Sequence, residues 1–67
     1  MDKFELAKVM EENADTPRTM ADFLGISLTS FYNKRNEYRT EFTQSEISKM
    51  AAKWNLSPER LQKIFFV

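Results

Sequence analysis

Helix-start signals recur along this chain at short intervals. Thr16-Pro17 and Ser57-Pro58 each place a hydroxyl residue before a proline, and a proline at the first helical position gives up no needed amide donor. Thr43 is followed three places later by Glu46, which is the spacing of a capping box. No run alternates apolar and polar residues as a half-buried strand does. The pattern therefore predicts an all-α fold.

Five short helices fit these signals, joined by short turns into a single domain over residues 1–67. Asp2 can cap the first helix, with Glu5 three places on, and this helix ends near Asn13. The expected helices cover about residues 3–13, 17–24, 28–34, 44–54 and 58–65. The chain shows no internal repeat, linker or low-complexity segment.

The lone glycine, Gly25, follows Leu24, the last apolar residue of the second expected helix, where a left-handed C-cap is wanted. Ser27 can then cap the third helix. Two short helices joined by a glycine-containing turn have the layout of a helix-turn-helix unit, here residues 16–36, whose second helix can enter a DNA major groove. Taken alone, the glycine has a simpler interpretation, as a C-cap between two packed helices of any α-domain.

The two sides of this candidate unit differ in composition. Apolar residues are expected to point back into a core, with a small one where the two helices cross: Met20, Ala21, Leu24, Ile26 and Phe31. The opposite side of the third helix is left with Thr29, Tyr32 and Asn33, together with the helix-opening pair Ser27 and Leu28.

The 67 residues include no His and no Cys, which removes the commonest general base, the commonest zinc ligand and any thiolate. A domain this small cannot also wall off a large substrate cavity. We therefore expect no enzyme, no cofactor and no metal. No stretch approaches the roughly 20 apolar residues that span a bilayer, and the acidic start does not resemble a signal peptide. This favours a soluble, intracellular protein without a membrane partner.

Ten basic and ten acidic residues give a formal net charge of zero, which argues against binding a polyanion by bulk attraction. The distribution is uneven. Residues 1–26 contain three basic and six acidic side chains, a net −3, and residues 27–67 contain seven and four, a net +3. The positive excess therefore falls on the half that holds the third helix and the loop after it.

Several segments match a known pattern: Thr16, Met20-Ala21, Leu24-Gly25-Ile26-Ser27, Phe31, Asn36, Glu41-Phe42-Thr43 and Asn55-Leu56-Ser57-Pro58-Glu59. Through them, over nearly its whole length, the chain resembles the helix-turn-helix domains of phage Cro and CI repressors and their bacterial relatives. The resemblance implies a five-helix, lambda-repressor-like fold and a sequence-specific transcriptional regulator. It also implies a double-stranded DNA operator, a homodimer on an inverted repeat, and a place in the cytoplasm or nucleoid of a bacterial host.

The resemblance also implies roles for individual residues. The third helix would lie in the major groove, with base edges facing Leu28, Thr29, Tyr32 and Asn33, and Ser27 at the start of the helix is a further DNA-binding residue. The phosphate backbone would face Thr16, Arg18 and Asn36, with Arg35 and Arg39 of the following loop as additional contacts. The simpler interpretation of the Lys34, Arg35 and Arg39 cluster is a solvated loop.

Two positions depart from the family pattern. Pro17 stands where the family usually has Gln, and Glu37 stands where many members have Gly. The zero net charge, the acidic first two helices, Pro17 at a contact position and candidate exposed aromatic residues favour an alternative function. This is an antirepressor or modulator of the same fold that binds a partner repressor protein. A dimer or partner surface, or simple packing onto the first and fourth helices, could involve Phe23, Phe65, Phe66 and Val67.

Overall fold

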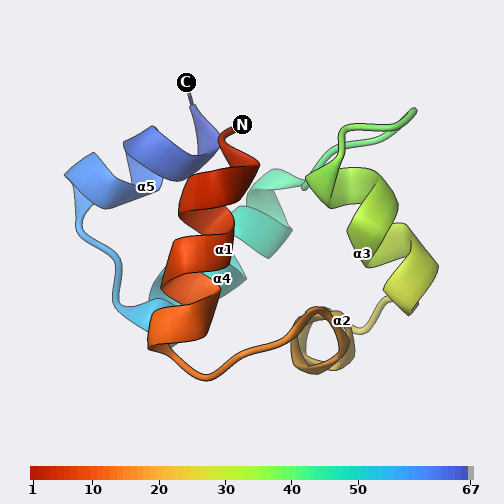
Figure 1. Ribbon diagram of the computed structural model, residues 1–67. Coiled ribbons are helices and arrows are strands. Elements are labelled where there is room, and N and C mark those ends of the chain that lie inside the picture. The colour runs from red at the N-terminus through yellow and green to blue at the C-terminus, as the bar shows by residue number, and fades with distance from the viewer. Residues whose placement is uncertain (67) are drawn as a thin grey trace.

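The computed structural model describes residues 1–66, which form five helices and their connections, without a strand in that range (Figure 1). The helices are α1 (Lys3–Glu12), α2 (Pro17–Leu24), α3 (Leu28–Arg35), α4 (Gln44–Trp54) and α5 (Pro58–Phe65). The all-α prediction and the five expected helices are confirmed. The third helix runs one residue further than expected, to Arg35, and Asn36 is its C-cap. Val67 lies outside the described residues.

The capping residues that the sequence indicates are in place. The side-chain oxygen of each accepts a hydrogen bond from the amide three residues later, at 3.0–3.2 Å, for Thr16, Ser27, Thr43 and Ser57. The Thr43 box is complete, because the Thr43 amide donates to the Glu46 carboxylate at 2.9 Å.

The cap of α1 differs from the expected box. The Asp2 carboxylate accepts from the amides of Phe4 and Glu5, as expected of a cap. The Asp2 amide, however, donates to the carbonyl of Ile64 at 2.7 Å, so it needs no bond from Glu5. The Glu5 carboxylate lies instead 3.4 Å from Lys63 Nζ. Both contacts join the start of α1 to α5.

A single core lies between the helices, and every helix contributes to it. Its buried apolar side chains are Leu6, Val9, Met10, Met20, Ala21, Leu24, Phe31, Phe42, Ile47, Met50, Trp54, Ile64 and Phe65. The expected core residues of α2 and α3 are among them, and Ile26 packs against them while only partly buried. In Figure 1 the α2 and α3 pair occupies one side of the molecule, and α1 with α5 the other.

A polar link joins the connection between α1 and α2 to α4. The indole Nε1 of Trp54 donates to Asp15 at 2.8 Å, and the Thr19 hydroxyl donates to the same carboxylate at 2.9 Å. Lys53 Nζ lies 3.3 Å from it. Burial acts to raise the pKa of the Asp15 carboxyl, but the hydrogen bonds and the charge of Lys53 outweigh burial and leave this pKa below its ordinary value.

We expect the free energy of unfolding to fall as the pH is lowered through the depressed pKa of Asp15. A carboxyl with a lower pKa in the folded state contributes stability above its unfolded pKa, about 3.9, and loses it as the pH falls through the folded value. Urea unfolding at several pH values between about pH 5 and pH 2 measures this loss of stability. It can be followed by the fluorescence of Trp54, whose indole bonds the Asp15 carboxylate. The Asp15→Asn variant should show a shallower acid dependence, and an unchanged one would contradict the assignment.

Gly25 adopts the left-handed conformation expected at the end of α2, with φ 71° and ψ 31°. A Cβ added there meets no atom within 4 Å, so backbone strain is the only penalty. We therefore expect Gly25→Ala to lower the free energy of unfolding by about 1–2 kcal/mol, as measured by urea titration. Gly25→Asn, whose side chain tolerates this conformation, should lose less. Equal losses in the two variants would show that strain is not the cause.

Candidate nucleic-acid interface

The turn between α2 and α3 is short and held by backbone hydrogen bonds. The Gly25 amide donates to the Asp22 carbonyl at 3.2 Å, and the Ile26 amide donates to the Ala21 carbonyl at 3.0 Å. Ser27 then caps α3. In Figure 1 α2 is seen along its axis while α3 runs across the picture, so the two helices meet at a wide angle. This arrangement leaves one long side of α3 at the surface.

Phe31 anchors α3 to the core. Its side chain is 0% exposed, and its ring meets that of Phe42 edge to face, with centroids 5.6 Å apart. Phe42 belongs to the loop after α3 and meets Phe65 of α5 in the same way, at 6.2 Å. The chain of three rings fixes which side of α3 faces inward and therefore which side faces out.

The outward side of α3 carries two of the expected base-reading residues, Thr29 and Asn33, together with Asn36, an expected phosphate contact. Successive residues turn by about 100° around a helix, so Thr29, Asn33 and Asn36 lie opposite Phe31. Thr29 and Asn36 are exposed, and Asn33 is half-buried. Exposed Ser27 and half-buried Leu28 lie at the start of the helix, and Tyr32 is 38% exposed on its flank. The structure therefore brings together the side chains that the sequence singles out.

The residues expected to face a phosphate backbone lie at the start of α2 and at the end of α3 or after it. Thr16 and Arg18 are exposed at the start of α2, although the Thr16 hydroxyl already accepts from the Thr19 amide. Arg39 is exposed in the loop after α3, with its guanidinium carbon 5.2 Å from the ring centroid of Tyr38. With Asn36, these residues place polar groups at both ends of the α2 and α3 pair.

The three cations Lys34, Arg35 and Arg39 have three different surroundings. Lys34 Nζ lies 2.8 Å from the Glu46 carboxylate, with both side chains largely buried, so Lys34 is not part of a free cluster. Arg35 is not a loop residue: it is the last residue of α3, half-buried, with its guanidinium carbon 4.8 Å from the ring centroid of Tyr32. Of Arg35 and Arg39, the two residues expected in the loop, Arg39 has an exposed loop position and Arg35 does not.

Local contacts hold the start of α2 despite the proline. The Thr16 amide donates to the Thr19 hydroxyl at 2.8 Å, and this hydroxyl donates in turn to Asp15. Thr16 and Thr19 therefore form a reciprocal capping box around Pro17. Thr19 could not be recognised from the sequence pattern, because a threonine at the third helical position replaces the Glu or Gln of the usual box.

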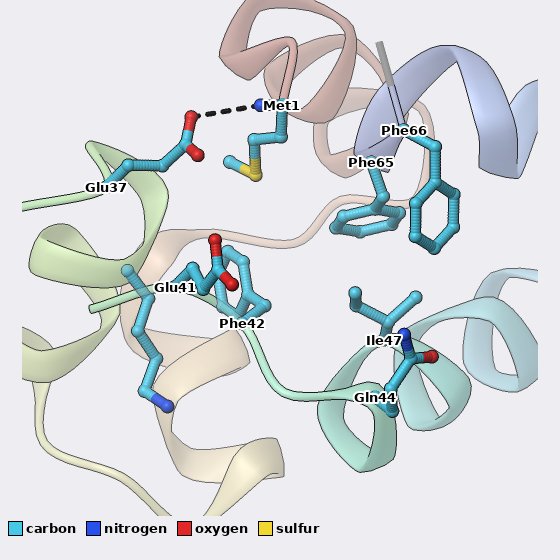
Figure 2. A pocket seen from close by; sticks show the side chains of 9 residues that line it. Met1, Glu37, Glu41, Phe42, Gln44, Ile47, Phe65 and Phe66 are labelled. Atoms are coloured by element: carbon cyan, nitrogen blue, oxygen red, sulfur yellow. Dashed lines mark hydrogen bonds and ion pairs between the residues drawn. The ribbon is translucent and has the colours of Figure 1, made fainter.

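The backbone of Glu37 lies in the left-handed region, with φ 56°. Many members of the family that the sequence resembles have Gly at this position. The Glu37 carboxylate lies 2.9 Å from the amino group of Met1, a contact drawn in Figure 2. The same view shows a hollow whose lining includes the apolar side chains of Phe42, Ile47 and Phe65. Its volume is about 190 Å³. Phe65 is thus part of the core, whereas Phe66 and Phe23 remain 49% and 43% exposed.

Charge neutralisation is uneven across the molecule. Within residues 1–66, five of the ten Lys and Arg side chains pair with a carboxylate: Lys8, Lys34, Lys53, Arg60 and Lys63. The other five are Lys3, Arg18, Arg35, Arg39 and Lys49. Three of these belong to the segment from α2 to the loop after α3, where Asp22 and Glu41 are the exposed carboxylates without a cation. Among its unpaired side chains, this segment therefore has three cations against two carboxylates, an excess of one positive charge.

None of the protein families, curated proteins or solved structures compared with this chain matches it. Within residues 1–66, no group of His, Cys, Asp or Glu side chains is arranged to hold a metal ion. No helix in the same range is long and apolar enough to cross a membrane.

Proposed function

We propose that this protein is a sequence-specific DNA-binding transcriptional regulator, similar to phage Cro and CI repressors, in which α2 and α3 act as a helix-turn-helix unit. The observation that supports it most is the outward row of Thr29, Asn33 and Asn36 on a helix locked to the core by Phe31. The row is polar, and within residues 1–66 none of its three side chains takes part in a hydrogen bond, so its donors and acceptors are available to a ligand. Such a protein acts in the cytoplasm or nucleoid of a bacterial host.

The dimensions and side chains of α3 suit a major groove. An α-helix with its side chains is about 10–12 Å across, which fits a major groove about 12 Å wide. Asn33 can bond an adenine edge in a bidentate manner, Thr29 and Leu28 can contact a thymine methyl, and the Tyr32 hydroxyl can reach a base or a phosphate. Arg18 and Arg39 supply charge for the backbone on either side.

A homodimer on an inverted repeat would present two α3 helices about 34 Å apart, one turn of DNA. Selection from random duplexes, with mass measurement of the complex, tests the proposal. We expect an inverted repeat with half-sites about 10 base pairs apart, two chains per duplex, and a plot of log K against log salt falling by about 0.9 per phosphate contact. Absence of any sequence preference at low salt would refute the proposal.

The exposed rings of Phe23 and Phe66 favour a second candidate, the antirepressor or modulator that binds a partner repressor. A variant with Tyr32 and Asn33 both changed to Ala separates the two. A DNA-binding regulator loses regulation with these residues, whereas a modulator that acts through Phe23 or Phe66 keeps it. Capture of a cognate repressor that depends on Phe23 or Phe66 would support the modulator.

A further inference from the structure

Arg35 does not have the surroundings of a freely solvated phosphate contact. Its side chain is half-buried, and the Nε atom is buried without a hydrogen-bond partner. Leaving such a donor unpaired is unfavourable, so another contact must hold the side chain in this position. That contact is the ring of Tyr32, whose centroid lies 4.8 Å from the guanidinium carbon. The guanidinium group of Arg35 is therefore in contact with a neighbouring aromatic side chain.

The ring of Tyr32 is held from two directions. Arg35 covers it from one turn along α3, and buried Phe31 meets it edge to face with centroids 6.4 Å apart. Tyr32 nevertheless remains 38% exposed beside the row of Thr29 and Asn33. An exposed aromatic side chain normally loses rotamer freedom when it binds, and this loss weakens binding. Here the contact with Arg35 restricts the ring before any ligand arrives.

We propose that Arg35 is a positioning residue for Tyr32: by stacking on the ring, it fixes Tyr32 in the orientation that reads one base pair of the operator. The inference rests on the proposed DNA-binding function and changes the role given to Arg35, from a phosphate contact to a determinant of sequence preference. Lysine separates these roles, because its ammonium keeps the positive charge but cannot stack as a planar guanidinium.

The test compares the unaltered protein with Arg35→Lys and Tyr32→Phe on operator duplexes changed at each half-site position in turn. We expect Arg35→Lys to lower the preference for the correct base pair roughly 2- to 10-fold, and only at the position that Tyr32→Phe also affects. This range corresponds to the cost of immobilising one side chain on binding. The slope of log K against log salt should stay unchanged. Arg18→Ala is the matched control: it should weaken binding to all sequences equally and reduce the slope by about 0.9.

The free protein supplies a second measurement. The NMR couplings of Tyr32 should show one dominant χ1 rotamer in the unaltered protein and averaging among rotamers in Arg35→Lys, with an unchanged unfolding midpoint. If Arg35→Lys keeps the base preference and the single rotamer, the inference is wrong while the proposed function stands. If Arg35→Ala behaves like Arg18→Ala, Arg35 is a phosphate contact. If the unaltered protein shows no sequence preference, the proposed function fails, and this inference with it.

Discussion

Replacing Phe31 with alanine is expected to lower the free energy of unfolding by about 3–5 kcal/mol. The side chain is fully buried and forms the ring contact that ties α3 to the loop after it. At about 0.05–0.15 kcal/mol per residue, a chain of 67 residues has a total stability of roughly 3–10 kcal/mol. The variant should therefore be partly or wholly unfolded at 25 °C, which urea titration followed by circular dichroism would measure.

Phe4 provides the matched control for this substitution. It is also a phenylalanine in a helix, but its side chain is 78% exposed. Phe4→Ala should change the free energy of unfolding by no more than about 0.5 kcal/mol. A loss in Phe4→Ala equal to that in Phe31→Ala would mean that the ring contacts of Phe31 do not anchor α3.

Asn33→Ala is expected to weaken binding to the selected operator by about 1–3 kcal/mol per half-site, or roughly 5- to 150-fold. The reason is the loss of a bidentate bond from the outward side of α3. The backbone carbonyl of Asn33 accepts from the Tyr38 amide at 2.8 Å, and alanine keeps this bond, so the fold should persist. Fluorescence titration with the operator and with an unrelated duplex measures both affinities.

Binding to the unrelated duplex should hardly change, because Asn33 is uncharged and non-specific affinity depends mainly on phosphate contacts. Ser48→Ala, an exposed substitution on α4, is the control for a change remote from α3 and should leave both affinities unaltered. Full retention of operator affinity by Asn33→Ala would remove Asn33 from the base-reading residues.

The helix boundaries could be predicted because their causes are local. Thr16, Ser27, Thr43 and Ser57 each bond an amide three residues later, and Gly25 meets a steric requirement of its own backbone. The inward position of Phe31 followed from its spacing among apolar neighbours. The outward position of Thr29 and Asn33 followed in turn from helical geometry.

The parts that could not be predicted depend on partners far along the chain. Trp54 bonds Asp15 across 39 residues, and Arg60 bonds Glu12 across 48. By sequence Lys34 forms a cluster with Arg35 and Arg39, because nothing near Lys34 in the chain shows that Glu46 neutralises it. For Arg35 the neighbour was close, only three residues away, but stacking on Tyr32 depends on side-chain conformations that spacing does not specify.

The contact between Asp2 and Ile64 has a topological consequence. It brings the two ends of the described chain together, as Figure 1 also shows. A short linker could therefore join the ends, and new termini could be opened in the exposed loop between α3 and α4 without separating α2 from α3. In such a circular permutant α2 and α3 would remain one continuous segment, and the packing of α1 on α5 would become a local contact that forms early in folding.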